Sequence, residues 1–375
     1  MRRRALLAAV PGLAILATGI LAFCFREGGR ADPLTKKVLE DIGGSVILPD
    51  YRRFAAEAER MQGAAVAFER DPTDRNLASL RSAWREARRA WKLCESHFIG
   101  PEAKRILQAK IDTPSIDTEK IEEIVSGPDP LDRAYVERLG ANRKGFAAIE
   151  YLLFAGDEPP GSAGKRLAAG PGSARRRQFL SSLAANLAGT SAEIRDIWEP
   201  GKGNYLAEFL RGRAEFDAPF PEKVSLDDLI NHLIAYTEDL ADLRLGRPLG
   251  IRASPLRKPD PALLESRWSG GSLEDLLASL DGVRVLYQGA PDRGLGLAAR
   301  VKAVSPEIHR AVLEALEKAA AGVKAIPAPV EKAVSEQNEA ALQAVEALTE
   351  LRSRFKVDLA SIYETRITVI RFDGD

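Results

Sequence analysis

The sequence predicts an all-α protein built as two packed helical bundles, and three observations support this fold class. Alanine and leucine dominate a 375-residue chain that is 45% hydrophobic but only 6% aromatic, a composition typical of helices. Apolar residues recur at helical spacing, and only the short tail from Arg366 to Phe372 alternates with a period of two. Because the length favours two domains, we expect bundles at residues 34–215 and 222–375.

In the first half, helices are expected over residues 45–70, 73–98, 143–154 and 174–198. The second of these has the clearest apolar face, formed at alternating spacings of three and four by Leu80, Trp84, Ala87, Trp91, Cys94 and Phe98. Gly100 and Pro101 end it, and residues 100–131 are expected to be a loop with short helical pieces. The glycine- and serine-rich residues 157–174 predict a flexible connection, and Tyr205 to Arg211 predict a helical turn.

In the second half, each expected helix follows a polar start signal. Ser225 with Asp228 predicts a helix to about residue 245, and Ser272 is expected to cap a helix that ends near Gly289. Ser305 followed by Pro306 is the strongest start, for a helix to about residue 324. A last helix is expected over residues 331–363.

Residues 1–30 are predicted to be a signal peptide or membrane anchor. Met1 to Arg4 are basic, and the uncharged apolar run from Ala5 to Phe25 is long enough to span a bilayer. Residues 21–24 resemble a lipoprotein box, with Phe23 where a small residue is usual. Three outcomes stay open: a lipidated Cys24, an uncleaved anchor, or cleavage between residues 28 and 31. We expect a membrane-tethered protein on the periplasmic side of the cell envelope.

The charge balance excludes nucleic acid as a partner. Lysine plus arginine equals aspartate plus glutamate at 54 each, so the chain lacks the positive field of a nucleic-acid binder. The two cysteines, Cys24 and Cys94, predict no internal disulfide in the mature chain, and Cys94 is expected to be a small core residue.

Glu150 is the clearest site candidate because it stands alone in the apolar run from Gly145 to Phe154. A buried carboxylate without a partner costs several kcal/mol or acquires a raised pKa, so Glu150 requires a partner elsewhere in the fold. It is either a ligand-binding residue or a buried acid satisfied by backbone amides, an arginine or a hydroxyl.

This run resembles the G-x-H-x-x-E signature of the imelysin family, bacterial cell-envelope proteins often tied to iron or copper supply. Gly145 and Glu150 occupy their places in the signature, and Ala147 stands where the family has histidine. The resemblance implies two helical bundles and a ligand site near the signature. The loss of the histidine weakens copper, nickel or zinc binding more than binding of a hard ion such as iron(III).

Other blocks follow the family order over most of residues 40–375. They are Trp84 to Trp91 with Glu95 and Gly100-Pro101; residues 111–117, which lack the family tryptophan; Arg244 to Gly250; Glu265 to Ser272; Gly294 to Gly296; and a closing Phe372 to Asp375 similar to that of imelysin-like lipoproteins.

The expected ligand-binding residues come from both halves: Glu95, Gly145, Ala147, Glu150, Glu265, Ser266 and Ser269. Glu150 and Glu95 are the predicted metal ligands, with iron or another divalent or trivalent ion as the candidate. Glu95 is equally compatible with a carboxylate at the rim of the core, paired with an arginine. The cluster from Glu265 to Ser269 is equally compatible with a self-capped loop.

The histidines argue against peptidase activity. His97, His232 and His309 form no pair at the spacing of zinc ligands, and a zinc hydrolase usually needs three protein ligands and a general base. His97 lies two residues beyond Glu95, and residues two apart point to different sides of a helix. We therefore expect a non-catalytic envelope protein that binds a ligand in metal acquisition, with the membrane and other envelope metal-uptake proteins as the candidate partners. The alternatives are a helical interaction module with a decayed metal site and, less favoured, a metallopeptidase.

Overall fold

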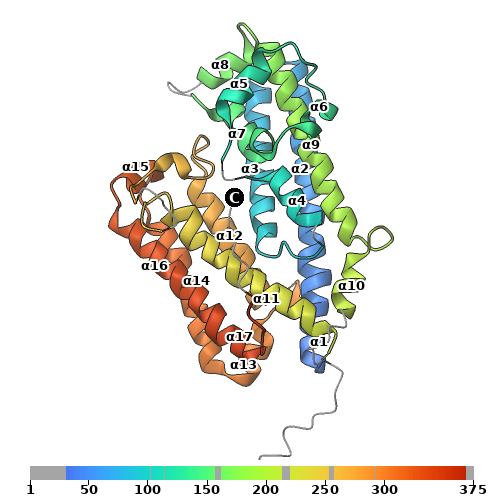
Figure 1. The fold of residues 1–375 in the computed structure, drawn as a ribbon, viewed down its shortest axis with the longest axis vertical. Helices are drawn as coiled ribbons and strands as arrows, with labels where there is room; N and C mark the ends of the chain where they lie inside the picture. Colours follow the sequence, from blue (N-terminus) through green and yellow to red (C-terminus); the bar gives the residue numbers. More distant parts are fainter. Residues whose placement is uncertain are drawn as a thin grey trace, which may run out of the picture.

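The computed structural model describes residues 31–368, apart from 102, 114, 157–161, 213–219, 253–256 and 291. This part of the chain is almost entirely helical, which confirms the all-α prediction (Figure 1). The predicted export segment, Cys24 and most of the residue 366–372 tail lie outside the described residues. Within residues 31–368, no described helix is both long and apolar enough to cross a membrane.

The first helix begins earlier than predicted. α1 (Pro33–Asp41) runs without a break through a π-helical segment, η2 (Ile42–Ile47), into α2 (Leu48–Arg70). Asp32 caps α1 by accepting a 3.0 Å hydrogen bond from the backbone N–H of Thr35, and Pro33 follows at the first position. The expected start at Ser45 was therefore wrong, because a complete start signal lies at residues 32–33.

α3 (Asp74–Glu95) is the predicted second helix, capped by Thr73. All six residues of its predicted apolar face are buried, and Cys94 is a free thiol in the core. α3 packs against α2, and α2 packs against the long α9 (Ser173–Trp198). These three helices form the body of the N-terminal half in Figure 1.

Short helices surround this body. The predicted pieces between residues 100 and 131 are α4 (Ala103–Ile111) and α5 (Thr118–Ser126), followed by α6 (Arg133–Arg138), η3 (Ala141–Arg143) and the signature helix α7 (Gly145–Phe154). α8 (Ser162–Ala168) occupies part of the expected flexible connection. The predicted turn at residues 205–211 is α10 (Tyr205–Arg211).

The C-terminal half begins with α11 (Glu222–Asp239), three residues before the predicted start at Ser225. α11 continues through a π-helical segment, η4 (Leu240–Gly246). After η5 (Pro261–Leu263), α12 (Ser272–Gln288) leads through the two-residue strands β1 (Gly289–Ala290) and β2 (Gly294–Leu295) to α13 (Ala298–Val304).

α14 (Pro306–Ala325) has the predicted Ser305 cap, whose Oγ accepts from the backbone N–H of Ile308 at 3.2 Å. The expected single last helix is instead divided into α15 (Val330–Ser335), α16 (Glu339–Ser353), η6 (Arg354–Leu359) and α17 (Ala360–Ile362). The break falls at Gln337, which has a positive φ of 46°, and at Asn338, which caps α16.

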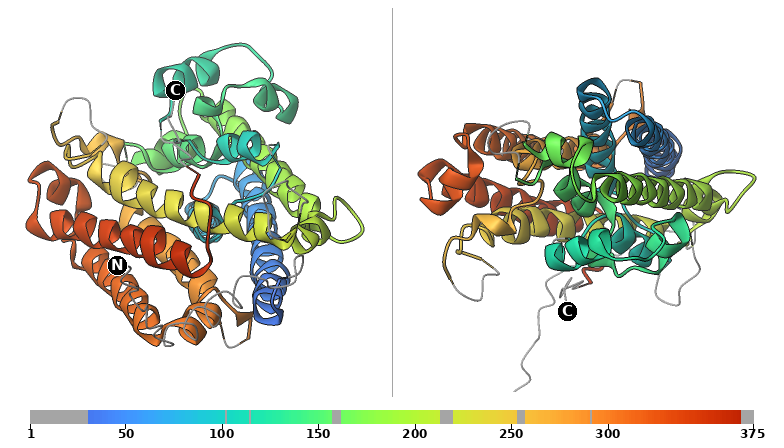
Figure 2. Two further views of the ribbon diagram at one scale, coloured as in Figure 1. Left: turned by 60° about the horizontal axis from the view of Figure 1, so that its bottom comes forward. Right: turned by 90° about the horizontal axis from the view of Figure 1, so that it is seen from above.

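The two halves meet where α3 packs against α12, and α1 adds contacts with β2 and α13 (Figure 2). α3 therefore has α2 on one side and α12 on the other. Polar residues on the α12 side of α3 can therefore pair with groups from the opposite half. The predicted boundary falls on residues 213–219, outside the described part, and stays a prediction.

Candidate functional site

A cluster of buried charges lies at the junction of the halves. We call it the charge cluster and define it as the ionic residues joined by direct contacts: Arg88, Lys92, Glu95, Asp112, Arg244, Glu265 and Asp275. It holds three cations and four carboxylates. Buried charges are tolerated when they are paired and hydrogen-bonded, so these residues hold one another inside the fold.

All three guanidinium nitrogens of Arg88, on α3, donate hydrogen bonds to carboxylates. Nη1 donates to Asp112 Oδ2 at 2.6 Å, Nε donates to Asp275 Oδ2 at 2.9 Å, and Nη2 donates to Glu265 Oε2 at 3.3 Å. Asp275 and Glu265 come from the C-terminal half. The planar fork of arginine suits such multiple pairing, and here it joins the two halves.

Lys92 and Arg244 complete the cluster around Glu95. Lys92 Nζ lies 2.9 Å from Glu95 Oε2 and donates to Glu265 Oε2 at 2.8 Å. Arg244 donates from Nη2 to Glu95 Oε1 at 3.1 Å and from Nη1 to Glu265 Oε2 at 2.6 Å. Tyr236 also donates to Glu95 Oε2, at 3.3 Å. Both oxygens of Glu95 are thus used inside the protein, at 2% exposure.

Local backbone features bring these side chains together. Arg244 projects from η4, and π-helical turns of this kind often occur at functional sites. Glu265 precedes a tight loop in which Ser266 has a positive φ of 49°. Burial alone would raise the pKa of Glu265, but Arg244, Lys92 and Arg88 hold that pKa below its usual range.

Glu150 of α7 lies beside this cluster but has only neutral partners. Its Oε1 accepts a hydrogen bond from the backbone N–H of Ser269 and another from the Ser269 hydroxyl, both at 2.8 Å. The partner that the sequence analysis required is therefore a serine of the opposite half. Ser269 Oγ also contacts the backbone oxygen of Ser266, at 3.0 Å, which ties the loop to itself.

The environment of Glu150 shifts its proton affinity. Burial raises the pKa of Glu150 from 4.5 to about 7, against the two hydrogen bonds from Ser269 and the attraction of Arg88. Glu150 therefore holds its proton at pH values where an ordinary glutamate is ionised. On α11, burial likewise raises the pKa of Asp239 to about 7, against the attraction of Arg244.

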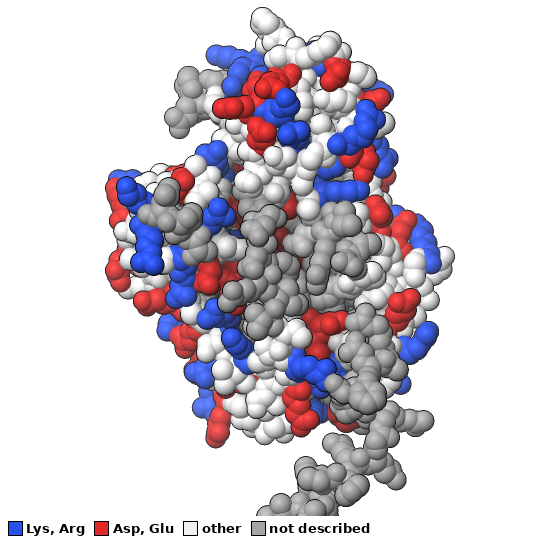
Figure 3. Space-filling view, in the orientation of Figure 1, with Lys and Arg blue, Asp and Glu red and all other residues white. Residues whose placement is uncertain are grey.

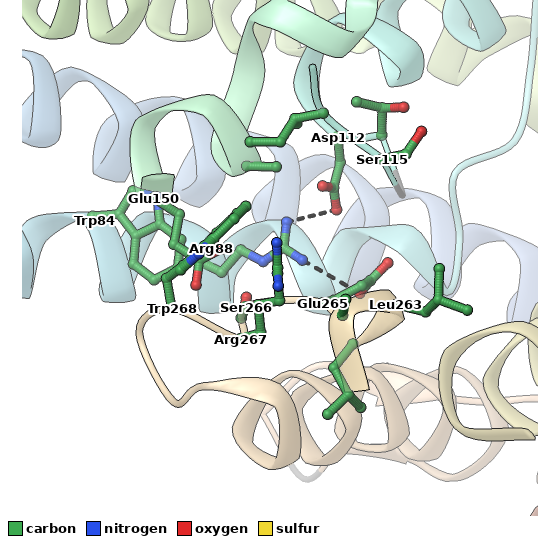
Figure 4. Close-up of a pocket in the computed structure, with 15 residues that line it drawn as sticks. Trp84, Arg88, Asp112, Ser115, Glu150, Leu263, Glu265, Ser266, Arg267 and Trp268 are labelled. Carbon is green, nitrogen blue, oxygen red and sulfur yellow. Dashed lines mark hydrogen bonds and ion pairs between the residues drawn. The ribbon is translucent and has the colours of Figure 1, made fainter. Parts of the chain in front are cut away.

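A cavity of about 120 Å³ lies between Glu150 and the charge cluster. Figure 4 shows the carboxylates of Asp112 and Glu265 bonded to the guanidinium of Arg88 in its wall. Both halves supply its lining, which consists of Trp84, Arg88, Asp112, Thr113, Ser115, Ile116, Ala147, Glu150 and residues 262–268. Ser115 and Ala262 are exposed, so the cavity reaches the surface beside them.

The signature residues have separate structural roles at this cavity. Gly145 has a φ of +74°, and a Cβ placed there would lie 2.3 Å from the backbone oxygen of Ile111, so glycine permits the close approach. Ala147 lines the cavity one helical turn before Glu150. A histidine in its place would project from the same face as Glu150.

The structure brings together most of the predicted site residues. Ala147, Glu150, Glu265 and Ser266 line the cavity, and Ser269 binds Glu150. Glu95 belongs to the charge cluster but does not line the cavity. The structure gives Glu95 and Glu150 different partners, and the metal-binding role predicted for the pair stays a prediction. The expectation that Ser272 caps α12 was wrong: Gly271 is the N-cap, and Ser272 Oγ donates to the backbone oxygen of Glu265 at 2.5 Å.

Sequence reasoning missed five charged residues of the cluster: Arg88, Lys92, Asp112, Arg244 and Asp275. One signal was available. Arg88 and Lys92 lie four residues apart on α3, beside the predicted apolar face, where uncompensated charge requires partners from another helix. Apart from Glu95, which lies three residues after Lys92, their partners lie between 20 and 187 residues away in sequence, so no local pattern identifies those partners.

The donor set at the cavity does not fit a resident transition-metal ion. His97 lies against Asp50, His232 contacts the backbone oxygen of Glu95, and His309 contacts Tyr287, so none lines the cavity or replaces the imidazole absent at Ala147. In the described ranges, no group of three or more His, Cys, Asp or Glu is placed to hold a metal ion. The carboxylates of the cluster already pair with arginine and lysine.

The face shown in Figure 3 carries interspersed basic and acidic residues without a large area of one sign. This agrees with the equal counts of basic and acidic residues in the sequence. The buried charges at the junction of the halves therefore contrast with an electrostatically mixed surface.

Comparisons with known proteins point to one family. The model of the Imelysin family matches residues 47–355. The chain is 27% identical over 282 residues to iron-regulated protein A of Synechococcus elongatus. This alignment covers 74% of this chain and 71% of that protein.

Two crystal structures have the same fold. One, from Parabacteroides distasonis, is described as a candidate iron-regulated protein A precursor. It has a TM-score of 0.74 at 17% identity, covering 90% of this chain and 97% of that chain. The other, an imelysin-like protein from Psychrobacter arcticum, has a TM-score of 0.69 at 16% identity and covers 91% and 99%.

Proposed function

Because the chain belongs to the imelysin family, we propose that it is a non-catalytic binding component of the cell envelope that serves iron acquisition. The family match and the similarity to an iron-regulated protein A support the link to iron. The apolar run after Arg4 supports export and tethering to the membrane, through Cys24 or an uncleaved anchor. Other envelope proteins of metal uptake are the proposed partners.

The observation that carries this proposal is the cavity of about 120 Å³ between the halves. Its walls come from α3, α7, the loop after α4 and the segment before α12, so a ligand there contacts both halves at once. Glu150 and Ser269 face each other across the same junction. Sites formed between two packed units are common places for small ligands.

The absence of catalysis is proposed on the chemistry of the cavity residues. The wall offers carboxyl groups, two serines, Arg267, and Arg88, which is already paired with carboxylates, but no imidazole or thiol. A hydrolase of the zinc type requires ligands that hold the metal while one coordination position stays open. Incubation with unfolded protein substrates and zinc should give no turnover. Turnover that Glu150→Gln abolishes would contradict the non-catalytic role.

A deletion strain of the organism that encodes the chain tests the proposed function. Under iron limitation, loss of the gene should slow growth and lower cellular iron, and the wild-type gene should restore both. Ala147→Leu, which fills the cavity, should fail to restore them. Glu137→Gln should restore them, because Glu137 pairs with Lys110 away from the cavity.

Two outcomes would argue against this function. Growth that does not depend on the gene at any iron level would contradict the role in iron acquisition. Full restoration by Ala147→Leu would show that the cavity is not used, and would favour a helical module that acts through its surface on another envelope protein.

A further inference from the structure

The helix that follows the predicted export segment, α1, is bound to the C-terminal half. Arg300 of α13 pairs with Asp32 at the start of α1 and donates to the Thr35 hydroxyl at 3.3 Å. The backbone N–H of Leu295 in β2 donates to Asp41 Oδ2, at the end of α1, at 2.9 Å. The point where a membrane tether would join the described chain is therefore fixed against α13 and β2.

In either tethered form, the link between the bilayer and this point is short. Residues 26–31 separate the apolar run from Asp32 and could span at most about 20 Å. Lipidation of Cys24 in place of an uncleaved anchor would lengthen the link only to about 25 Å. The continuous helical rod formed by α1, η2 and α2, residues 33–70, is about 55 Å long. One end of this rod would therefore be held near the membrane, while the other end can extend well beyond it.

Exposed apolar side chains gather at the held end. Val357 of η6 and Val304 of α13 are 61% and 59% exposed, the largest fractions for large apolar residues in the described ranges. Leu295 of β2 is 38% exposed. α14 and α17 each pack against both α13 and η6, and Figure 1 shows α1, α13 and α17 at one end of the molecule. Scattered apolar residues are normal on a surface, but these three lie on adjoining segments and are suited to an interaction site.

Lysines accompany the two exposed valines. Lys302 lies on α13 and Lys356 on η6, and both side chains are exposed and form no salt bridge with a described residue. The acid of η6, Asp358, pairs with Arg354 at 3.1 Å. Exposed acids such as Glu307 at the start of α14 keep this end from being strongly basic. Anionic lipids would therefore strengthen a contact that the tether and the apolar residues establish, since stable membrane attachment needs more than one signal.

The cavity lies far along the rod from this end. The ring centroid of Phe54 on α2 lies 5.3 Å from that of Trp91 and 6.2 Å from that of Phe146. Ala147, the neighbour of Phe146, lines the cavity. Phe54 is about 30 Å from Pro33 along the rod, at about 1.5 Å per residue. A protein that stands on its α1 end would thus hold the cavity about 30 Å from the membrane surface.

We propose that a surface at the α1 end of the protein contacts the bilayer to which the chain is tethered. We call it the anchor-end surface and define it as Leu295, Lys302, Val304, Lys356 and Val357. Its apolar side chains enter the headgroup region, and its lysines bind the phosphates of anionic lipids. The inference rests on the proposed function for the tether. It adds an orientation, in which the cavity lies away from the membrane and can exchange its ligand with soluble partners.

Fluorescence quenching of the full chain reconstituted in vesicles tests this contact. A bimane label is attached to Val304→Cys or Val357→Cys, and to Ala174→Cys as the matched control. Ala174 is exposed at the start of α9, which packs against α8, and Figure 1 shows α8 at the opposite end of the molecule. The vesicles contain phosphatidylethanolamine, phosphatidylglycerol and a lipid with a nitroxide quencher near its headgroup. Labelling of the unsubstituted chain measures the background from the native cysteines.

We expect the labels on Val304→Cys and Val357→Cys to be quenched several times more strongly than the label on Ala174→Cys, because nitroxide quenching acts only over short distances. Phosphatidylcholine in place of phosphatidylglycerol should weaken this quenching without abolishing it, since it removes only the attraction of the lysines. With the label on Val304→Cys, the added changes Leu295→Asp and Val357→Asp should reduce the quenching, because they place charges where the apolar side chains would enter the headgroup region.

Three outcomes would overturn the contact. Equal quenching of the three labels would mean that the tethered protein has no preferred orientation. Weak quenching of all three in protein that floats with the vesicles would leave the anchor-end surface to a protein partner. Quenching unchanged by Leu295→Asp and Val357→Asp would mean that the apolar residues do not make the contact.

Flotation separates these failures from failure of the proposed function. Protein that does not float with the vesicles would contradict the tether itself, and this inference with it. Protein that floats but gives one of the three outcomes above would contradict the anchor-end surface alone. The growth experiment under iron limitation uses neither vesicles nor these variants, so it tests the link to iron separately.

Discussion

Glu95 and Glu150 are two buried glutamates at the same junction, and they differ in their partners. Glu95 has Lys92 and Arg244 on its two oxygens, whereas Glu150 has only the amide and hydroxyl of Ser269. Glu95 is therefore fixed by charges within the protein, and Glu150 keeps a raised pKa beside a cavity. The difference indicates that the charge cluster holds the halves together, while the cavity wall stays available for a ligand.

The largest expected effect comes from breaking the charge cluster. Lys92→Met removes a fully buried cation and leaves Glu95, Asp112 and Glu265 undercompensated. We expect the free energy of unfolding to fall by about 3–5 kcal/mol in urea titrations. Lys110→Met, which removes the partially exposed pair with Glu137, should cost less than about 1 kcal/mol. Equal losses would contradict a stabilising role specific to the cluster.

Glu150→Gln should raise the free energy of unfolding instead of lowering it. The pKa of Glu150 is near 4.5 when unfolded and about 7 when folded, so the folded state holds more protons between these pH values. Wild-type stability contributed by this group is therefore complete below pH 4.5 and lost as the pH rises to 7. The Glu150→Gln variant has no ionisable group at this position and does not lose stability in this way. It should be more stable than the wild type by up to about 3 kcal/mol at pH 8.

Urea titrations of both forms at pH 4.5 and pH 8 measure this difference. The advantage of Glu150→Gln should be smaller at pH 4.5 than at pH 8. An advantage that is the same at both pH values would show that the pKa of Glu150 is not raised.

Gly145→Ala should destabilise the contact between the start of α7 and the backbone at Ile111, next to the cavity wall. The new Cβ would lie 2.3 Å from the backbone oxygen of Ile111, at a φ of +74° that disfavours alanine. We expect a loss of about 1–3 kcal/mol in thermal or urea unfolding. Gly63→Ala in α2, where no atom lies within 4 Å, should be neutral or slightly stabilising. Destabilisation by both would point to a general intolerance of the helices to substitution.

Ala147→His should have the smallest effect on stability, because the cavity has room for part of the ring. It should strengthen copper(II) binding relative to the wild type, since imidazole and the Glu150 carboxylate would then share one helix face. Calorimetry with Ala147→His/Glu150→Gln as the control checks this. Equal copper binding by Ala147→His and by Ala147→His/Glu150→Gln would mean that the ion binds elsewhere.

The helices were predictable from the sequence because their signals are local. The apolar face of α3 and the Ser305 cap of α14 were both confirmed by burial and by hydrogen bonds. The predicted helix boundaries were wrong at two capping residues, Asp32 before α1 and Asn338 before α16. The break at Gln337 depends on a positive φ that no periodicity reveals.

The site was predictable only in part, for a different physical reason. Glu150 stood out because a lone acid in an apolar run needs a partner, but that partner, Ser269, lies 119 residues away. The pairing of Arg88 with Asp275 spans 187 residues and is decided by the packing of α3 on α12. The existence of the cavity likewise follows from tertiary structure alone.

The most direct test of the central claim compares Glu95→Gln with Glu150→Gln in urea titrations at pH 8. The account predicts that Glu95→Gln lowers the free energy of unfolding, because Lys92 and Arg244 lose a buried charged partner. It also predicts that Glu150→Gln raises the free energy of unfolding, because the variant removes a carboxyl group whose pKa is raised by burial. Changes of the same sign in both variants would contradict the distinction between the two glutamates.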